Sequence, residues 1–354
     1  MIKGKRRANR NTNALGPKKL ILSSDDYGFS KTVNQGILKA VELGTVTCVH
    51  VLMNMASEED VRLLAKTIHK AGNKCGIGLH LNTNSGPSLI NKDSALSPVL
   101  KNNHYDFLEL EDFRFKDVKI SDVAAELWAQ YHKLASIIGT ERIDSISSHY
   151  NIHVYSKFYL GNVLQIAKST NIPIRSPLRW VTKTKRNKLP KYPHGKKIMP
   201  ITKEGVNVGL KLFGGGTFKQ MSVTLPTQDK KLIKIRKRIR KYVKTPDNLS
   251  GHWLGQPKLD ALEWSYNQLK KMKRNSFCTE ILMHLSGSPT AEKNDYPTTY
   301  GMERRHKEFE VITSPEAVAF CTKLYNDNEV QLGSFRKVLL GQDISYDLDA
   351  GAVV

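Results

Sequence analysis

At 354 residues, the chain is long enough for one large α/β domain or two ordinary ones, and its 40% hydrophobic and 8% aromatic content excludes wholesale disorder. Its formal net charge of +22 indicates attraction to an anionic partner, such as nucleic acid, anionic lipid or an acidic polymer, and carries no information about the fold.

The four cysteines are scattered and form no CxxC pair. This argues against a zinc finger or a disulfide framework and favours a reducing compartment. The sequence shows no secretory leader pattern and no apolar run of about 18 residues. We therefore expect a cytoplasmic protein with no transmembrane segment.

Residues 1–18 are polar and basic and predict a flexible arm. From Lys19 on, β-rich and helical segments alternate, with Ser30 and Ser57 as expected helix N-caps. The predicted strands cover 19–24, 46–55, 75–82, 143–149, 172–177 and 277–286. The predicted helices cover 30–44, 57–72, 121–139, 157–170, 230–244, 257–273 and 315–327, and residues 330–339 close the regular part. This alternation predicts parallel strands covered by helices, in either an open doubly wound sheet or a barrel.

Two stretches interrupt this alternation: an Asn- and Ser-rich insertion at about 83–118 and a basic insertion at about 181–257. We place both within a single domain that runs from 19 to 340 and is followed by a tail at 341–354. In both candidate architectures, functional residues gather at the C-terminal ends of the strands. Those positions are therefore where catalytic side chains are expected.

Aspartate and histidine side chains recur near the ends of the predicted strands. They are Asp25 and Asp26, His80, His149 and His153, and His284. Each has an ordinary explanation: an aspartate pair before a glycine is a common turn, and a histidine between apolar neighbours is more often packed in a core. Their recurrence at successive strand ends, drawn from only 11 histidines, favours one shared site.

Carboxylates and imidazoles that converge in this way are typical of a divalent metal site. One carboxylate and two imidazoles can hold an ion while leaving positions open for water and substrate. Two adjacent aspartates point in different directions, so one can bind the ion while the other accepts a proton. A histidine from another strand can then protonate the leaving group. Together these groups predict metal-assisted hydrolysis of an amide or ester.

The same residues lie in blocks that resemble the YdjC-type carbohydrate deacetylases, the chitooligosaccharide deacetylase family. The blocks are SSDDYGFSKTVNQGILKAVELGTVTCVHVLMN, GIGLHLNTNSGPSL, ISSHYNIHVY, IPIRSPLR and TEILMHLSGSP, with a closing block that ends in LGSFRKV. They occur in order from about Lys19 to Val338 and cover most of the chain. The resemblance implies an α/β fold, a distorted (β/α) barrel of the polysaccharide-deacetylase kind. It also implies removal of N-acetyl groups from N-acetylglucosamine-containing sugars.

The resemblance further implies a role for each matched residue. Asp26, His80 and His149 match the metal ligands, Asp25 matches the general base, and His284 matches the histidine that assists the leaving amine. The family points to magnesium as the divalent metal. One carboxylate with two imidazoles also suits zinc on chemical grounds, so both metals stay open.

Three positions depart from the family pattern. Ser147 stands where the family has an aspartate, which removes a carboxylate able to orient a ligand. Asn151 replaces a histidine, and Leu285 replaces a proline. None of these changes removes a matched ligand, so deacetylation stays the expectation and the precise sugar stays open.

An N-acetylated oligosaccharide is the expected partner, and four residues are candidates to bind it. Arg175 and Arg179 could hydrogen-bond to it, although an ordinary surface ion pair explains either arginine equally well. His153 matches the last histidine of its block and would support the site or contact substrate. Trp180 is the candidate for stacking on a sugar ring, with plain packing as its alternative.

Two basic segments, 183–197 and 230–244, are not explained by a neutral sugar. In the second, Leu232, Ile235 and Ile239 recur at helical spacing, which is normally a flanking helix with a solvated basic face. The alternative is an anionic partner, such as a membrane surface or nucleic acid. Two other functions therefore stay open. One is a basic, non-catalytic protein that binds glycan or nucleic acid on a degenerate deacetylase barrel, and the other is a hydrolase of this fold acting on another amide or ester.

Overall fold

The computed structural model describes residues 16–83, 85–90, 100–101, 106–107, 120–151, 153, 157–177, 230–250, 259–271, 277–290 and 301–347. Several predictions fall outside these residues: those for Arg179, Trp180, the basic segment 183–197, the basic arm up to residue 15 and most of both insertions. No described helix is both long enough and apolar enough to cross a membrane. All four cysteines are buried and have free thiols.

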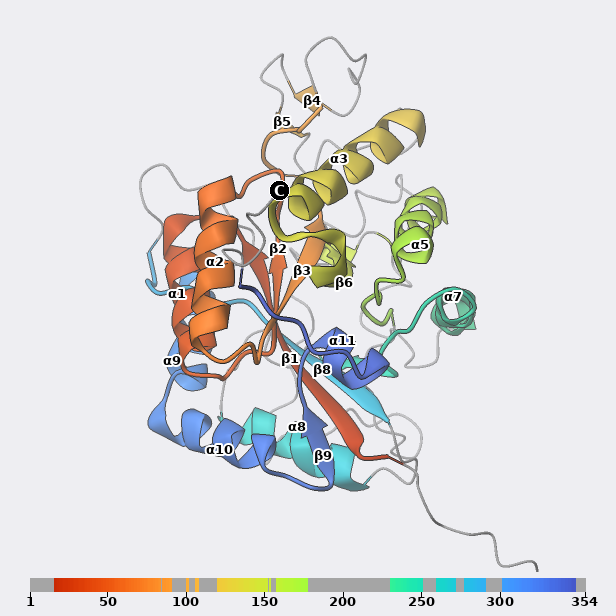
Figure 1. Cartoon of the computed structure of the whole chain (residues 1–354). Helices are drawn as coiled ribbons and strands as arrows, with labels where there is room; N and C mark the ends of the chain where they lie inside the picture. Colours follow the sequence, from red (N-terminus) through yellow and green to blue (C-terminus); the bar gives the residue numbers. More distant parts are fainter. Residues whose placement is uncertain are drawn as a thin grey trace, which may run out of the picture.

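Strands and helices alternate along the described chain, as the sequence predicts (Figure 1). The strands are β1 (Lys18–Tyr27), β2 (Cys48–Val51), β3 (Gly76–Leu81), β4 (Leu100–Lys101), β5 (Asp106–Phe107), β6 (Ile143–Ser148), β7 (Asn248–Ser250), β8 (Cys278–Met283) and β9 (Val330–Leu332). The α-helices are α1 (Lys31–Glu42), α2 (Glu58–Lys70), α3 (Ile120–Ile138), α5 (Lys157–Thr170), α7 (Lys230–Arg240), α8 (Leu259–Lys271), α9 (Met302–Ile312), α10 (Pro315–Tyr325) and α11 (Phe335–Leu340). Short 3-10 helices at Thr140–Arg142 and His149–Asn151 flank β6.

A parallel sheet forms the centre of the molecule, in the strand order β6-β3-β2-β1-β8-β7. β9 pairs with the first residues of β1, and β4 and β5 form a separate antiparallel pair. The segment after α5 links the two ends of this sheet: Ile174 bridges Ile146 of β6, and its N–H donates to the carbonyl of Lys244, shortly before β7. The sheet is therefore curled into a half-barrel surrounded by helices. This confirms the predicted α/β fold and its distorted barrel.

The segment 172–177 does not form the full strand predicted for it. Its only bridge to a described strand is the one at Ile174. Pro173 and Pro177 lack the backbone N–H that a continuous ladder requires, so the pairing cannot extend through them. The prediction of a strand is wrong beyond this one bridge, although the segment takes the place of a strand in the barrel.

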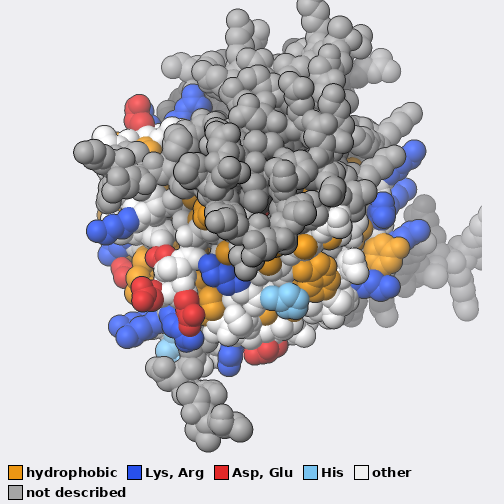
Figure 2. All heavy atoms as spheres, turned by 90° about the horizontal axis from the view of Figure 1, so that it is seen from above, with side chains coloured by type: hydrophobic (Ala, Val, Ile, Leu, Met, Phe, Trp, Pro, Cys, Tyr) orange, Lys and Arg blue, Asp and Glu red, His pale blue; other side chains and the backbone are white. Residues whose placement is uncertain are grey.

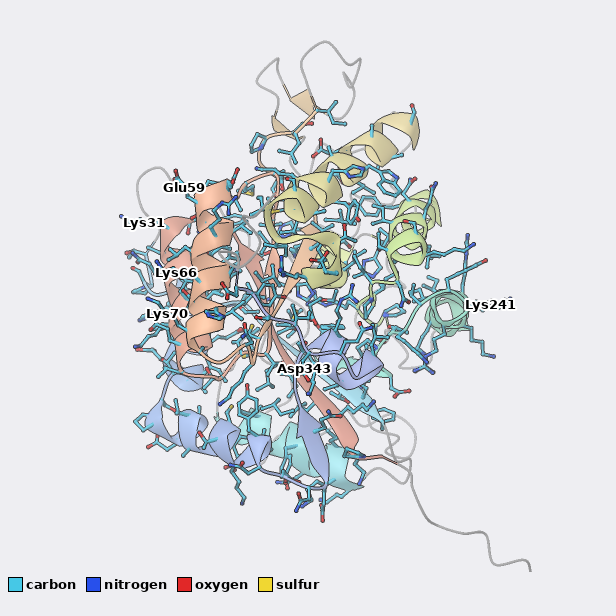
Figure 3. The ribbon with its side chains drawn as sticks, in the orientation of Figure 1. Lys31, Glu59, Lys66, Lys70, Lys241 and Asp343 are labelled. Atoms are coloured by element: carbon cyan, nitrogen blue, oxygen red, sulfur yellow. The ribbon has the colours of Figure 1, made fainter. Side chains whose placement is uncertain are left out.

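Both predicted N-caps are confirmed. The Ser30 hydroxyl accepts a hydrogen bond from the N–H of Val33 at the start of α1. Ser57 accepts from the N–H of Asp60 at the start of α2, and the Asp60 carboxylate accepts from the Ser57 N–H in a capping box. The two helices lie side by side on one flank of the sheet (Figure 1). Their outer faces carry the charged side chains labelled in Figure 3: Lys31, Glu59, Lys66 and Lys70.

Strands β2, β3, β6 and β8 are buried along their whole length, as expected for a parallel sheet with covered faces. The segment expected as a C-terminal tail also joins this core. Tyr346 is 1% exposed, and its hydroxyl accepts from the N–H of Ile77 (2.7 Å) and donates to the carbonyl of Arg142 (2.9 Å). Part of the segment expected as a tail, which the structure describes up to residue 347, thus belongs to the packed domain.

Helix α7 has the amphipathic form predicted for the segment 230–244. Ile239 is fully buried, whereas Lys234, Lys237, Arg238 and Lys241 are exposed. Seen from above, the described edge on the side of α7 shows basic side chains without acidic ones, while both signs are mixed over the side of α1 and α2 (Figure 2). The structure shows a flanking helix with an exposed basic face, which fits both a solvated surface and a surface for an anionic partner.

Candidate active site

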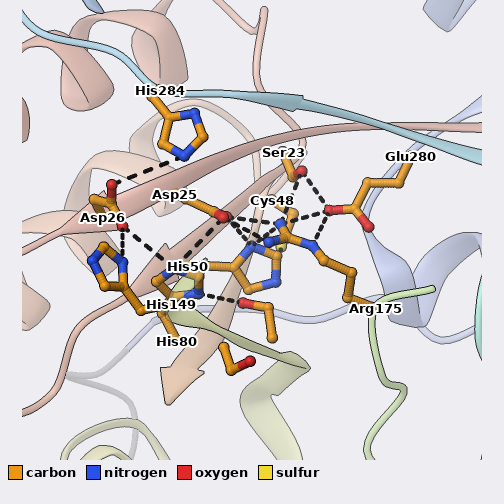
Figure 4. A network of polar contacts seen from close by, with 12 residues as sticks. Ser23, Asp25, Asp26, Cys48, His50, His80, His149, Arg175, Glu280 and His284 are labelled. Atoms are coloured by element: carbon orange, nitrogen blue, oxygen red, sulfur yellow. Dashed lines mark hydrogen bonds and ion pairs between the residues drawn. The ribbon is translucent and has the colours of Figure 1, made fainter. Parts of the chain in front are cut away.

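The end of β1 brings two adjacent carboxylates, those of Asp25 and Asp26, into the same buried site. In a regular strand, neighbouring side chains point to opposite faces of the sheet. Asp26 instead has a φ of 72°, and the pairing of β1 with β2 shifts its register between Ser24 and Tyr27. Aspartate adopts this left-handed backbone more readily than most residues. The irregularity allows both carboxylates to join one network (Figure 4).

Asp26 forms a compact cluster with two of the predicted histidines. One ligand atom from each of Asp26, His80 and His149 lies within 4.8 Å of the others, and all three residues are buried. Oδ1 of Asp26 is 3.0 Å from Nδ1 of His149 and 3.3 Å from Nε2 of His80. They come from the C-terminal ends of β1 and β3 and from the turn after β6. A carboxylate and two imidazoles so arranged could bind a divalent metal ion.

Two residues from other elements orient this cluster. The hydroxyl of Ser147 on β6 lies 2.6 Å from Nδ1 of His80, so that Nε2 is the ring atom facing Asp26. From α9, Nη2 of Arg305 donates to Oδ2 of Asp26 at 2.6 Å. Burial alone would raise the pKa of Asp26, but the charges of His149 and Arg305 hold that pKa well below its usual range. Asp26 is therefore a carboxylate at neutral pH.

Arg175 and His50 both contact the carboxylate of Asp25. Nη1 and Nη2 of Arg175 donate to the two oxygens of Asp25 at 2.6 and 2.7 Å, a bidentate pair. Nδ1 of His50, on β2, lies 3.0 Å from Oδ1 of Asp25. Burial would raise the pKa of Asp25, but the charges of Arg175 and of nearby His80 hold that pKa well below its usual range. Asp25 is thus ionised beside the cluster of Asp26, His80 and His149.

Both predicted roles of Arg175, a substrate contact and a surface ion pair, require a surface position. Arg175 is instead fully buried. Besides Asp25, its guanidinium pairs with the buried carboxylate of Glu280 on β8, with Nε 2.8 Å from Oε1. Ser23 donates to the same Glu280 oxygen at 2.6 Å. The buried cation thus has two carboxylate partners and no surface left for a sugar. Its position assigns it to holding Asp25.

His284 lies on the side of Asp26 that faces away from His149, as Figure 4 shows. Its Nε2 lies 4.0 Å from Oδ2 of Asp26, its side chain is 17% exposed, and its backbone N–H donates to Glu308 of α9 at 2.7 Å. Burial lowers the pKa of His284 to about 4, against the opposing charge of Asp26. His284 is neutral near pH 7 and has more solvent contact than the three cluster residues.

His153 lies apart from this group. Its Nδ1 is 2.5 Å from the hydroxyl of Ser148, and its side chain is fully buried. It is therefore not part of the Asp26, His80 and His149 cluster, and its role of supporting the site or contacting substrate stays a prediction. The structure thus brings together Asp25, Asp26, His80, His149 and His284.

Four residues of this site are absent from the sequence-based predictions. They are His50, Glu280, Arg305 and Glu308. His50 and Glu280 are polar residues in the middle of strands whose other members are mostly apolar, and that mismatch is a usable signal. Arg305 and Glu308 lie on α9, whose pattern of MERRHKEFEVI resembles an ordinary charged surface helix.

The family of this chain follows from its sequence over most of its length. A family model described as YdjC-like protein matches residues 19–323. The chain belongs to the YdjC-like family. This confirms the resemblance seen in the sequence blocks, and the residues of the candidate site lie within the matched region.

Among curated proteins, this YdjC-like chain is similar to a carbohydrate deacetylase from Clostridium beijerinckii. The two are 33% identical over 160 residues, which cover 44% of this chain and 59% of the relative. A chitooligosaccharide deacetylase from Klebsiella pneumoniae is 26% identical over 156 residues, covering 44% of this chain and 58% of that protein. In both cases the match spans less than two thirds of the relative's length.

A solved structure supports the fold. A protein from Enterococcus faecalis described as a candidate for cellobiose-phosphate cleavage superposes with a TM-score of 0.62 at 19% identity. The alignment covers 92% of the YdjC-like chain and 100% of that structure. At this identity the likeness shows a shared fold.

Proposed function

We propose that this YdjC-like protein is a metal-dependent carbohydrate deacetylase that hydrolyses N-acetyl groups on N-acetylglucosamine-containing sugars. The observation that carries the proposal is the buried Asp26, His80 and His149 cluster, flanked by an ionised Asp25 and a neutral His284. A cation site with a carboxylate and an imidazole on either side suits amide hydrolysis. The names of the similar curated proteins give the substrate class.

The residues present fit a divalent cation. Asp26 is a buried carboxylate whose pKa is held low, and His80 is turned by Ser147 to present Nε2 toward it. His149 completes a set of one oxygen and two nitrogen donors. This set suits zinc chemically, whereas the family resemblance favours magnesium, which we propose first. When bound, such an ion lowers the pKa of a water and polarises a carbonyl group.

Asp25 is the proposed general base. It is ionised, fixed by Arg175 and placed directly beside the cluster, with Oδ2 3.6 Å from Nε2 of His80. A carboxylate in this position can accept the proton of a water that attacks the acetamide carbon. Its low pKa makes it a weak base, so the water must be acidified by its surroundings.

His284 is the proposed donor to the leaving amine. Its partial exposure supports this role, because its side chain is 17% exposed whereas that of Asp25 is 3% exposed. Because its imidazole is neutral near pH 7, it must take up a proton before it can give one to the amine. The two residues thus have complementary tasks, one at the attacking water and one at the leaving group.

The decisive experiment measures acetate released from N-acetylated chitooligosaccharides by the purified protein. We expect release that is abolished by chelation and restored by adding back magnesium or zinc, with Asp25→Asn as the inactive control. Absence of acetate with either metal would contradict the deacetylase proposal. Activity on other amides or esters, with none on acetylated sugars, would favour a hydrolase of the same fold with a different substrate.

An anionic partner is a second proposal, which a separate surface supports. Lys234, Lys237 and Arg238 on α7 and Lys241 in the turn after it are exposed, and no carboxylate among the described residues is paired with them. Such a row of cations suits a polyanion such as nucleic acid. This surface is compatible with catalysis at the barrel, and also with the non-catalytic binding function. The cytoplasmic location expected from the cysteines likewise stays a prediction.

A further inference from the structure

A chain of hydrogen bonds runs from the candidate base across the barrel. Nδ1 of His50 on β2 lies 3.0 Å from Oδ1 of Asp25 on β1, and Nε2 of the same ring lies 2.9 Å from the hydroxyl of Ser145 on β6. All three residues are buried, with His50 and Ser145 fully inaccessible. Ser145 is therefore no nucleophile for an external substrate, and the chain can act only through Asp25.

The barrel leaves space for this imidazole. Gly78 of β3 lies between β2 and β6, and a Cβ placed on it would come within 2.5 Å of His50 Cδ2 and 2.7 Å of Ser145 Oγ. The backbone of Gly78 does not have a positive φ, so space, and not conformation, requires the glycine. The rings of Phe335 and His50 pack in a T-shaped arrangement, with 5.8 Å between the ring centroids. The ring is thus held in one orientation.

The two oxygens of Asp25 have different surroundings. Oδ1 is contacted by two nitrogens, Nδ1 of His50 at 3.0 Å and Nη2 of Arg175 at 2.7 Å. Oδ2 accepts from Nη1 of Arg175 at 2.6 Å, and it is the oxygen nearer to His80, 3.6 Å from its Nε2. A carboxylate oxygen has two lone pairs. With a proton on Nδ1 of His50, both lone pairs of Oδ1 are used, whereas Oδ2 keeps one on the side of Asp26, His80 and His149.

We propose that His50 is a positioning residue that makes Oδ2 of Asp25 the oxygen that takes up the proton. In this arrangement Nδ1–H of the neutral ring donates to Oδ1, and Nε2 accepts from the Ser145 hydroxyl. The opposite tautomer would place a ring lone pair 3.0 Å from a carboxylate oxygen, an unfavourable contact, although Nη2 of Arg175 is 3.1 Å away and could donate to it. The catalytic part of this inference rests on the proposed function. The tautomer assigned to His50 does not depend on it.

The tautomer is tested directly by nitrogen NMR of protein labelled at histidine, with the His50 signals assigned by their loss in His50→Asn. We expect a neutral ring with the proton on Nδ1 at pH 7, and a changed Nε2 signal in Ser145→Ala. A proton on Nε2 would overturn the proposal. This measurement needs no substrate, so it decides the point even if the protein releases no acetate.

Kinetics test the positioning role. In His50→Leu, which lacks the donor, kcat should fall about 10–100-fold while KM and metal affinity stay close to wild type. His50→Asn should recover most of that loss, because its amide nitrogen lies near the place of Nδ1. Gly78→Ala, which displaces the ring without removing a polar group, should resemble His50→Leu. Equal rates for His50→Leu and wild type, or no recovery in His50→Asn, would overturn the role.

Discussion

Nδ1 of His80 lies 2.6 Å from the hydroxyl oxygen of Ser147, which belongs to the paired strand β6. The contact turns the other ring nitrogen, Nε2, toward Asp26 at 3.3 Å. A hydroxyl that accepts from Nδ1–H favours the tautomer whose Nε2 has a free lone pair. Ser147 therefore takes over the orienting task of the family aspartate, but without its charge.

This contact predicts how metal affinity responds at residue 147. Ser147→Asp should tighten binding of a divalent cation by about 10-fold, and Ser147→Ala should weaken it by about 10-fold, because partners of a ligand histidine typically matter at this level. Titration calorimetry with magnesium and with zinc measures both. Ser148→Ala is the matched control, since that hydroxyl contacts His153 and not a ligand. Equal affinities for all variants would contradict the orienting role.

The two histidines of the block ISSHYNIH should differ in their effect on metal affinity. His149→Ala removes one of three ligands and should reduce metal affinity by more than about 100-fold, beyond the usual effect of losing a supporting partner. His153→Ala should leave affinity unchanged, because His153 contacts Ser148 outside the cluster. Metal content after dialysis, measured by elemental analysis, checks both. Retention of metal by His149→Ala would refute the ligand assignment.

Asp25→Asn should keep the metal and lose turnover. The expected fall in acetate release is on the order of 100- to 10,000-fold, the usual contribution of a general base. The variant should stay folded, because Glu280 continues to pair with the buried Arg175. Metal titration and thermal unfolding of the same preparation separate the three effects. A near-normal rate in this variant would show that the base is another group.

The acid stability of the protein should depend on His153. Burial, with the charges of Arg175 and His80, lowers the pKa of His153 to about 3, whereas an unfolded chain has the ordinary value of 6.5. Between these values the unfolded state binds a proton that the folded state does not, so this group makes unfolding easier as pH falls from 6.5. From pH 7 to 4.5 the loss is about 2–3 kcal/mol.

His153→Asn removes that proton uptake. Its free energy of unfolding, from urea titrations at a series of pH values, should therefore decline less steeply between pH 7 and 4.5 than that of wild type. The difference between the two proteins isolates this group from the lowered aspartates, which are common to both. Parallel curves would mean that His153 does not titrate as its burial requires.

A polyanion should bind through α7 and the turn after it. Replacing Lys234, Lys237 and Lys241 with glutamate should weaken binding to a single-stranded DNA oligonucleotide. It should also reduce the slope of log affinity against log salt by about 2, roughly 0.7 for each lost phosphate contact. The control reverses Lys31, Lys66 and Lys70 on the opposite flank. An equal loss of DNA affinity in both triple variants would indicate only a general charge effect and contradict a specific role of this surface. Asp25→Asn should bind the oligonucleotide as wild type does.

Much of the barrel could be predicted from local pattern, because parallel strands and amphipathic helices have distinct periods and the serine caps have distinct chemistry. Strand ends also identified a set of aspartates and histidines, since strands of one parallel sheet place their C-terminal ends at one edge. The family resemblance then singled out Asp26, His80 and His149 as ligands. For the segment 172–177 the local pattern gave a wrong prediction. Its apolar residues suggest a strand, but Pro173 and Pro177 restrict pairing to Ile174.

The supporting residues could not be predicted because their partners are distant in sequence. Arg175 meets Asp25 and Glu280 across 150 and 105 residues, and Arg305 meets Asp26 across 279. A local window contains no information about such pairs. From sequence alone Arg175 resembles a surface arginine, and only the curled sheet shows that it is enclosed between two carboxylates.

The left-handed backbone at Asp26 limits how this site could evolve. Aspartate, asparagine and glycine accept that conformation readily, whereas other residues lose about 1–2 kcal/mol by adopting it. A change from aspartate to glutamate, which would otherwise be an easy route to a new metal preference, is therefore opposed by the backbone conformation at this position. Variation is easier at positions such as Ser147, on regular strand, than at residue 26. Related chains that retune their metal should therefore differ around this aspartate and leave the residue itself unchanged.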